Sequence, residues 1–228
     1  MFYYSYSYLF YMLPGLLLML YAQFKVRHSF SKYSKVTNSR GLTGADAARE
    51  VLRQNGVDGV RIEHVSGNLS DHYDPRTNVI RLSDDVYNST SVAAVGVAAH
   101  EAGHAVQYAK SYGPIKLRAA IIPVCNIGSQ LGIPLALIGA IIGIMGLVYV
   151  GIALFSLALV FQLVTLPVEF NASRRAINAI NSTAILTKEE ASGAKAVLSA
   201  AAMTYVAAMI QTLLTLLYYL SRFTGRRD

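Results

Sequence analysis

The segment AAHEAGHAVQ, residues 98–107, contains two histidines and a glutamate in an arrangement found in metal-dependent enzymes. His100 and His104 are four residues apart, so on a helix their side chains lie on one face, about one turn from each other. Two imidazoles in that arrangement could bind one metal ion, and the carboxylate of Glu101 beside them could take a proton from a water molecule. This pattern is typical of zinc enzymes that hydrolyse peptide bonds.

The alternative is an accidental pattern in an alanine-rich helix, because a histidine on a helix is more often structural than metal-binding. Two observations favour the metal site. The chain has only 5 histidines, and two of them stand in this register. The histidines are also surrounded by small side chains, which would let other backbone approach them: Ala98, Ala99, Ala102, Gly103 and Ala105.

A catalytic zinc site needs three protein ligands and an open position. Glu169, in LPVEFNASRRA, is the leading candidate for the third ligand, because an acid beside an apolar stretch is costly unless a cation lies next to it. The alternative for Glu169 is an ion pair with Arg174 or Arg175. His72, in SDHYDPR, is the rival ligand. The weaker candidates are His28, His64, Asp71 and Asp74.

The composition predicts that these residues belong to a membrane protein. Of the 228 residues, 54% are hydrophobic and 14% are charged, and the mean hydropathy is +0.39. Charged residues are absent from residues 1–24, 119–168 and 196–221. A helix needs about 20 apolar residues to cross the hydrocarbon core. The first and last stretches therefore fit one span each, and the longer middle stretch fits two.

The middle stretch must turn on the far side of the membrane. Gly139, Gly143 and Gly146 are the expected place for a tight turn. Pro123 and Pro134 make the first half of this stretch the most irregular span, with a re-entrant segment as the alternative. The opening stretch of the chain has its positive charges after the apolar core, so we expect a retained anchor and not a signal peptide.

Lysine and arginine beside the spans predict the orientation, because cytoplasmic flanks carry an excess of both. Four crossings place the basic flanks of the first three spans on one side, which is then cytoplasmic. Arg222, Arg226 and Arg227 in the tail are an exception, unless the last helix does not cross fully. The net charge of +7 comes mostly from these flanks, so we expect a lipid bilayer and no nucleic acid as partner. The flanking residues are Lys25, Arg27, Lys32, Lys35, Arg40, Lys110, Lys116, Arg118, Arg174 and Arg175.

Two helices are predicted in the region between the first and second spans. TGADAAREVLRQNG is predicted as a helix that begins at a capping box of Thr43 and Asp46 and ends near Asn55. A second helix is capped by one of residues 89–91 and runs to about Lys110. This second helix carries the two histidines.

Two strands are predicted between these helices. Residues 60–65 and 78–83 alternate apolar and polar side chains, and turn-forming residues lie between them. The pattern predicts a hairpin or short antiparallel sheet. Residues 78–83 could be an edge strand that holds an extended substrate by main-chain pairing, or a plain core strand.

The predicted fold class is a mainly α membrane protein with about four transmembrane helices and a small cytoplasmic α+β, zincin-like domain that contains an HExxH helix. The predicted segments are a transmembrane anchor at 1–24, a cytoplasmic domain at 25–118 with its HExxH helix at about 90–110, a two-helix transmembrane hairpin at 119–168, a cytoplasmic segment with the third ligand at 169–195, a transmembrane helix at 196–221 and a tail at 222–228.

These motifs resemble those of the YugP-like neutral zinc metallopeptidases, a family of membrane proteins, and more distantly those of the HtpX and CAAX-prenyl protease group. HEAGH, the apolar hairpin after it, EFNASRRA and DHYDPRTNVIRLS carry the resemblance over nearly the whole chain. In the distant group the third ligand is the glutamate of an E-x-x-A-D-x-x-A pattern, which corresponds to Glu169, Ala172 and Ala176. Ser173 stands where that pattern has aspartate, so Ser173 and Asn171 are expected around the ligands.

The sequence thus predicts a zinc-dependent metalloendopeptidase that holds one zinc ion per chain. His100, His104 and Glu169 are the expected ligands, and Glu101 is the expected base, which passes its proton to the leaving amine. Because Glu169 directly follows a span, the metal should lie near the cytoplasmic membrane surface. The polypeptide substrates are then expected to be membrane-associated or misfolded proteins, and the location a bacterial cell membrane.

His72, Tyr73 and Arg76 are candidates for contacts with the substrate or the transition state, and each could equally be a structural turn residue. The competing function is a zinc-stabilised membrane scaffold that binds partners without cutting them. Glu101 separates the two, since a scaffold needs no carboxylate beside its ligands. A transporter is ranked last, because the spans lack a charged pathway.

Overall fold

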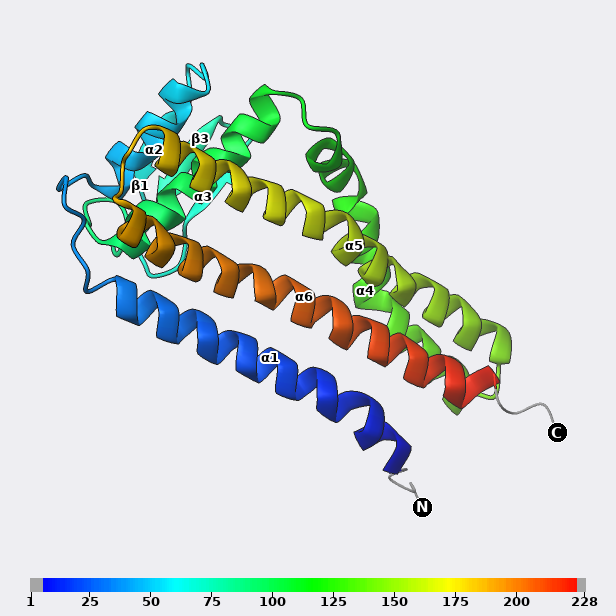
Figure 1. The fold of residues 1–228 in the computed structure, drawn as a ribbon. Coiled ribbons are helices and arrows are strands. Elements are labelled where there is room, and N and C mark those ends of the chain that lie inside the picture. Colours follow the sequence, from blue (N-terminus) through cyan, green and yellow to red (C-terminus); the bar gives the residue numbers. More distant parts are fainter. Residues whose placement is uncertain (1–5, 225–228) are drawn as a thin grey trace. The chain divides into compact units, whose positions relative to one another are not determined.

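Six α-helices and three short strands form the described part of the chain, residues 6–224, in this computed structural model (Figure 1). Residues 1–5 and 225–228 lie outside it, and with them Arg226 and Arg227 of the predicted tail. The helices are α1 (Tyr6–Tyr33), α2 (Gly44–Gln54), α3 (Val92–Ala109), α4 (Gly113–Ile141), α5 (Met145–Ser182) and α6 (Lys188–Thr224). The strands are β1 (Arg61–His64), β2 (His72–Asp74) and β3 (Val79–Leu82). The prediction of a mainly helical protein is confirmed.

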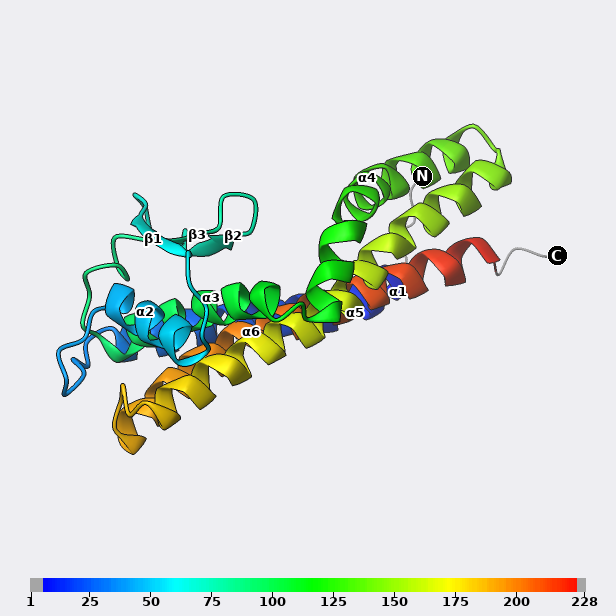
Figure 2. The same cartoon turned by 90° about the horizontal axis from the view of Figure 1, so that it is seen from above.

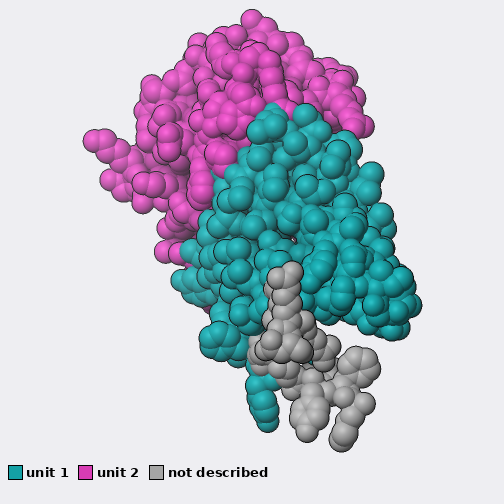
Figure 3. Space-filling model, turned by 90° about the vertical axis from the view of Figure 1, so that its right-hand side faces the viewer, with its two compact units in different colours: residues 1–23, 117–166, 203–228 teal, residues 24–116, 167–202 magenta. Residues whose placement is uncertain are grey.

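The described residues divide into two compact units (Figure 3). Residues 6–23, 117–166 and 203–224 form the first unit, which consists of helix segments and the turn between α4 and α5. Residues 24–116 and 167–202 form the second unit, which contains the sheet, α2 and α3. All three predicted metal ligands belong to the second unit.

The long helices have the apolar surface that a membrane requires. By length and composition, α1, α4, α5 and α6 could each cross a membrane, which confirms four candidate spans. Large apolar side chains such as Leu16 and Ile127 are exposed on them, as expected for a surface that faces lipid. α4 is a single helix through Pro123 and Pro134, so the described chain has no re-entrant break there.

α4 and α5 form a helical hairpin, as predicted, with its turn at residues 142–144. Gly143 lies in this turn at φ +78°, a conformation that favours glycine, whereas the two other glycines predicted for the turn lie inside α4 and α5. Glycine also lets the two helices approach. A Cβ atom on Gly132 would lie 2.5 Å from the backbone nitrogen of Phe155. The hairpin therefore packs backbone against backbone, as helices in membranes commonly do.

α3 is the central helix of the second unit. The sheet lies along one side of α3, and the segments of α5 and α6 that belong to this unit lie along the other (Figure 2). The side chain of Ser91 caps α3 by accepting a hydrogen bond from the backbone N–H of Ala94, which confirms the predicted start. The apolar side chains between these layers form one core, which includes the fully buried Val51, Ile80, Leu82, Val92, Ile180 and Ile185.

The sheet differs from the predicted hairpin in both order and direction. Its order is β1-β3-β2, with β1 parallel and β2 antiparallel to β3. The segment predicted as a turn contains β2, and a tight turn joins β2 to β3. The Asp74 carboxylate closes this turn by accepting hydrogen bonds from the backbone N–H of Arg76 and the hydroxyl of Thr77. β1 must therefore reach the other side of β3 by a crossover.

The central position of β3 also corrects the prediction for residues 78–83. Both edges of β3 are paired, and Val79, Ile80 and Leu82 are fully buried. The edge-strand interpretation of this segment is therefore wrong, and the core-strand interpretation is confirmed. The edges of the sheet are β1 and β2.

α2 begins with the predicted capping box. Thr43 accepts a hydrogen bond from the N–H of Asp46 at 3.1 Å, and Asp46 accepts one from the N–H of Thr43 at 3.1 Å. The hydrogen bond from the Thr43 side chain lowers the pKa of Asp46 below its ordinary value of 3.8, although burial opposes this shift. Since α2 packs against α3, the cap supports the helix that carries the histidines.

At pH 7, Thr43→Ala is expected to lower the free energy of unfolding by about 1 kcal/mol, because the first turn of α2 loses its cap. Denaturant unfolding in detergent micelles measures this loss. Because the folded-state pKa of Asp46 is lowered, its stabilising contribution is present above pH 3.8 and is lost as the pH falls below that value. The loss caused by Thr43→Ala should therefore be smaller at about pH 3. An equal loss at both pH values would contradict the ionic part of this cap.

Candidate metal centre

His100, His104 and Glu169 come together from two helices of the second unit. The histidines lie on α3 and the glutamate on α5. Glu169 Oε2 lies 3.3 Å from His100 Nε2 and 3.5 Å from His104 Nε2. One donor atom from each residue lies within 4.8 Å of the other two. Among residues 6–224, this is the one such group of histidine, cysteine and acidic side chains.

The geometry and chemistry of the three donors fit zinc. Nitrogen and oxygen ligands at about 2.0–2.1 Å from a tetrahedral zinc ion lie about 3.3–3.4 Å from each other. The side chains of His100, His104 and Glu169 have exposed fractions of only 16%, 12% and 4%. A zinc ion would place a positive charge beside this deeply buried carboxylate. Three protein ligands also leave the fourth position that catalytic zinc requires.

Glu169 faces the histidines and not the arginines that follow it. Arg175 donates a hydrogen bond from Nε to Asn171 Oδ1 at 2.8 Å, and Arg174 is exposed. The position of Glu169 beside the two histidines thus supports the metal-ligand interpretation over an ion pair with Arg174 or Arg175.

The rival and weaker candidates for the third ligand have other partners. His72 is exposed on β2, and its Nδ1 lies 2.7 Å from the carbonyl oxygen of Ser70. The others bond or stack elsewhere: Asp71 with Ser83, Asp74 with Arg76 and Thr77, His64 with Asp84, and His28 with Phe24. None of these residues belongs to the group of three within the described chain.

A close backbone contact brings α5 to the histidines. A Cβ atom on Gly103 would lie 2.7 Å from the carbonyl oxygen of Ala172, which is closer than side-chain carbon atoms approach. Gly103 precedes His104, and Ala172 lies one helical turn after Glu169. The expectation that small residues let other backbone approach is therefore confirmed, and α5 is the helix that approaches.

Each histidine has a different outer partner. His100 Nδ1 lies 3.1 Å from the hydroxyl of Ser173, and His104 Nδ1 lies 3.0 Å from Gln107 Oε1. Ser173 was expected near the ligands, but Gln107 was missed. The signal for Gln107 was its place three residues after His104, where a helix brings side chains together. Such outer partners orient the ligands of a metal.

The charges of the site also act on His104. Burial opposes protonation, but the hydrogen bond to Glu169 and the negative charges of Glu101 and Glu169 outweigh it and raise the pKa of His104. The site therefore favours positive charge at the position where the three donors meet, whether a proton or a metal ion supplies it.

The carboxylate of Glu101 is held by the edge strand β2. The backbone N–H of Tyr73 donates a hydrogen bond to Glu101 Oε2 at 3.0 Å. Asp71 lies near the same carboxylate: burial raises the pKa of Asp71, the hydrogen bonds from Ser83 oppose this shift, and the charge of Glu101 adds to it. The main chain of β2 thus positions the predicted base beside the ligands.

Three other predicted site residues lie on β2 or in the turn after it. The hydroxyl of Tyr73 donates to Asn78 Oδ1 at 2.7 Å, so this side chain contributes to the hairpin. Arg76 is exposed, and its backbone N–H bonds to Asp74. His72 is exposed on the same strand. Their contact with a substrate stays a prediction.

Comparison with known proteins supports the same chemistry. A family model described as "Putative neutral zinc metallopeptidase" matches residues 8–224. "Putative membrane protease YugP" of Bacillus subtilis (strain 168) is 48% identical over 221 residues, which cover 97% of this chain and 98% of that protein. No solved structure matches the chain.

The role of Glu169 predicts a clear difference between two variants. Purified wild-type protein should contain about one zinc ion per chain, by the three-ligand geometry. Glu169→Ala should weaken zinc binding by more than about 100-fold, which exceeds the effect of losing an outer partner. His72→Ala should keep the wild-type affinity. Metal analysis and competition with a chelator measure both, and the reverse pattern would make His72 the third ligand.

The contact at Gly103 predicts a second pair of variants. Gly103→Val places a side chain against the Ala172 carbonyl, so it should lower the free energy of unfolding by about 1–3 kcal/mol and weaken zinc binding. Gly113→Val is the control, because a Cβ at Gly113 meets nothing within 4 Å. Thermal unfolding and zinc competition give the two readouts. Equal behaviour of both variants would show that the contact is not tight.

Proposed function

The chain belongs to the family described as "Putative neutral zinc metallopeptidase", and from this premise we propose that it is a zinc-dependent endopeptidase of the membrane. The observation that carries the proposal is the meeting of His100, His104 and Glu169, with Glu101 beside them on α3. The named family and the membrane protease relative give the reaction class. The substrates and the side of the membrane are our own inferences.

His100, His104 and Glu169 would hold the metal. Zinc, when bound, makes water more acidic and polarises a carbonyl group. Glu101 would take the proton of the attacking water and later give it to the leaving amine, so that the same carboxylate serves as base and as acid. Since β2 already positions the Glu101 carboxylate, the reaction would not require this side chain to lose further conformational freedom.

An extended polypeptide would pair with the edge of β2 that does not face β3, through main-chain groups other than the N–H of Tyr73, which is bonded to Glu101. β3 cannot accept it, because β1 and β2 occupy both of its edges. In β2, the N–H of Tyr73 points away from β3 and toward Glu101, next to the metal ligands. A substrate strand at this edge would lie across α3 with its backbone near the reacting groups. Main-chain pairing recognises extended segments with little regard to sequence, which suits misfolded or unstructured substrates.

The charge pattern supports action at the cytoplasmic surface of a bacterial cell membrane. Glu169 is the first charged residue after the apolar residues 119–168, so its part of α5 would leave the membrane there. By the positive-inside rule, the basic flanks of the first three spans favour the cytoplasm for that side. Membrane-associated proteins and their juxtamembrane segments are therefore the proposed substrates.

The proposal predicts the behaviour of Glu101→Gln. This variant should keep its zinc, because Glu101 is not a ligand, while its cleavage of an unfolded protein should fall by about 10²–10⁴-fold through loss of the base. Glu63→Gln, at a half-buried glutamate on β1 that pairs with Arg61, is the matched control and should keep full activity. Metal analysis and gel-based cleavage assays measure the two properties.

Two results would contradict the proposal in different ways. Cleavage that persists in Glu101→Gln would exclude the role given to this residue. A wild-type protein that holds zinc and cleaves nothing would favour the scaffold alternative. Membrane-protein fragments that accumulate in cells with the wild-type chain, and not with Glu101→Gln, would support the proposed substrates.

A further inference from the structure

Gln107 is a fully buried polar residue on α3, one turn after His104. Its amide nitrogen donates to the carbonyl oxygen of Val168 at 2.8 Å and to Asn171 Oδ1 at 3.0 Å. Its amide oxygen lies 3.0 Å from His104 Nδ1. A buried amide that loses such partners costs free energy, so this set of bonds restrains the side chain strongly.

The partners determine which way the amide of Gln107 faces. A backbone carbonyl can only accept, so the Val168 oxygen requires the NH₂ group on its side. The oxygen of Gln107 must then face His104. Because an amide oxygen is only an acceptor, His104 Nδ1 must carry the hydrogen of this bond. The Nε2 atom of neutral His104 therefore keeps its lone pair, and it is this atom that faces Glu169.

Gln107, Asn171 and Arg175 form a hydrogen-bond network, in which Asn171 lies between the other two residues. Its Oδ1 accepts from Gln107 and also from Nε of Arg175 at 2.8 Å. The guanidinium of Arg175 lies 5.9 Å from the ring centre of Tyr112. Two donors on one oxygen prevent the Asn171 amide from turning over, because its NH₂ group would then face both donors.

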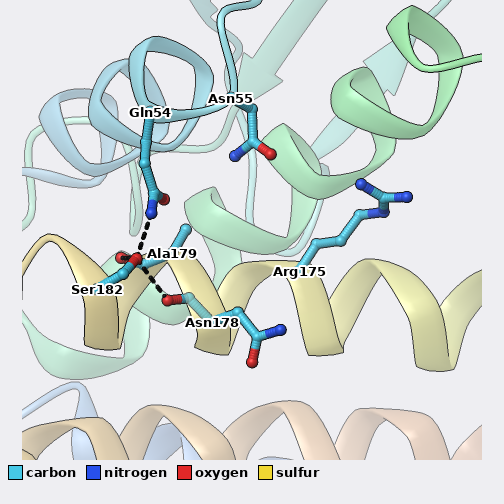
Figure 4. A pocket seen from close by; sticks show the side chains of 6 residues that line it. All are labelled: Gln54, Asn55, Arg175, Asn178, Ala179 and Ser182. Carbon is cyan, nitrogen blue, oxygen red and sulfur yellow. Dashed lines mark hydrogen bonds between the residues drawn. The ribbon is translucent and has the colours of Figure 1, made fainter.

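The outer end of the network lies at a cavity of about 360 Å³ between the end of α2 and α5 (Figure 4). Arg175 lines this cavity but none of the metal ligands does. The lining residues are Gln54, Asn55, Arg175, Asn178, Ala179 and Ser182. The chain of bonds thus runs from a solvent-accessible arginine to a buried metal-ligand candidate.

His100 has no comparable restraint. Its Nδ1 faces the hydroxyl of Ser173, and a hydroxyl can either donate or accept. Ser173 therefore tolerates both neutral forms of His100, whereas Gln107 tolerates only one neutral form of His104.

We propose that Gln107 is a positioning residue that presets His104 as a zinc ligand, and that Asn171 and Arg175 hold Gln107 in that orientation. This inference rests on the proposed zinc site. It concerns the donor atom and orientation of His104 before a metal arrives. Outer partners of this kind commonly change metal affinity by about 10–100-fold.

The test compares Gln107→Leu with wild-type protein in detergent. We expect zinc affinity, measured by chelator competition, to fall by about 10–100-fold, and the visible absorption of the cobalt-substituted site to change because His104 is no longer oriented. Gln54→Leu is the control, since Gln54 bonds to Ser182 and not to the network. A folded Gln107→Leu protein with wild-type zinc affinity and cobalt spectrum would overturn the proposal.

A second pair of variants decides the matter if Gln107→Leu does not fold. Asn171→Asp keeps an oxygen that accepts from Gln107 and Arg175, so zinc affinity should stay near that of the wild type. Asn171→Leu removes the acceptor and should weaken zinc binding. Equal affinities of these two variants would overturn the proposal. Wild-type protein that binds no zinc would contradict the proposed function itself, and the role of Gln107 with it.

Discussion

The candidate metal site depends on the close contact of α3 and α5 at Gly103. Donor atoms from two helices must meet within 3.5 Å, and the Ala172 carbonyl already occupies the space that a Cβ at Gly103 would need. Protein interiors have little free volume, so a larger side chain would move the helix and not merely fill a gap. The position of Glu169 beside the histidines therefore requires a residue without a side chain, glycine, at position 103.

That contact buries polar groups, and their partners make the burial tolerable. An isolated buried carboxylate is costly, but Glu169 lies against two imidazoles. Gln107 bonds through both ends of its amide, and Asp71 accepts hydrogen bonds from the backbone and side chain of Ser83. These buried polar groups of the second unit thus lie around the candidate ligands, and each of them has a hydrogen-bond or charged partner there.

Local patterns predicted the helices better than the sheet. The Thr43 cap and the two histidines depend on residues a few positions apart, so the sequence alone could identify them. The order β1-β3-β2 depends on pairing between distant segments, and turn-forming residues concealed β2. The uncharged stretch 119–168 likewise indicates where the apolar residues end, but it does not indicate where the helix ends. α5 accordingly continues through Glu169 to Ser182 without a break.

The two histidines have unequal outer partners, because His100 faces the hydroxyl of Ser173 and His104 faces the amide of Gln107. Ser173 stands where the pattern of the distantly similar group has aspartate, and a carboxylate beside His100 would hold its ring and increase its basicity. The hydroxyl of Ser173 is neutral and can reverse its hydrogen bond. His104, by contrast, faces the amide of Gln107, which is restrained on both sides. The negative charge of this region therefore lies on the candidate ligand Glu169, on the predicted base Glu101 and on the partly buried Asp71.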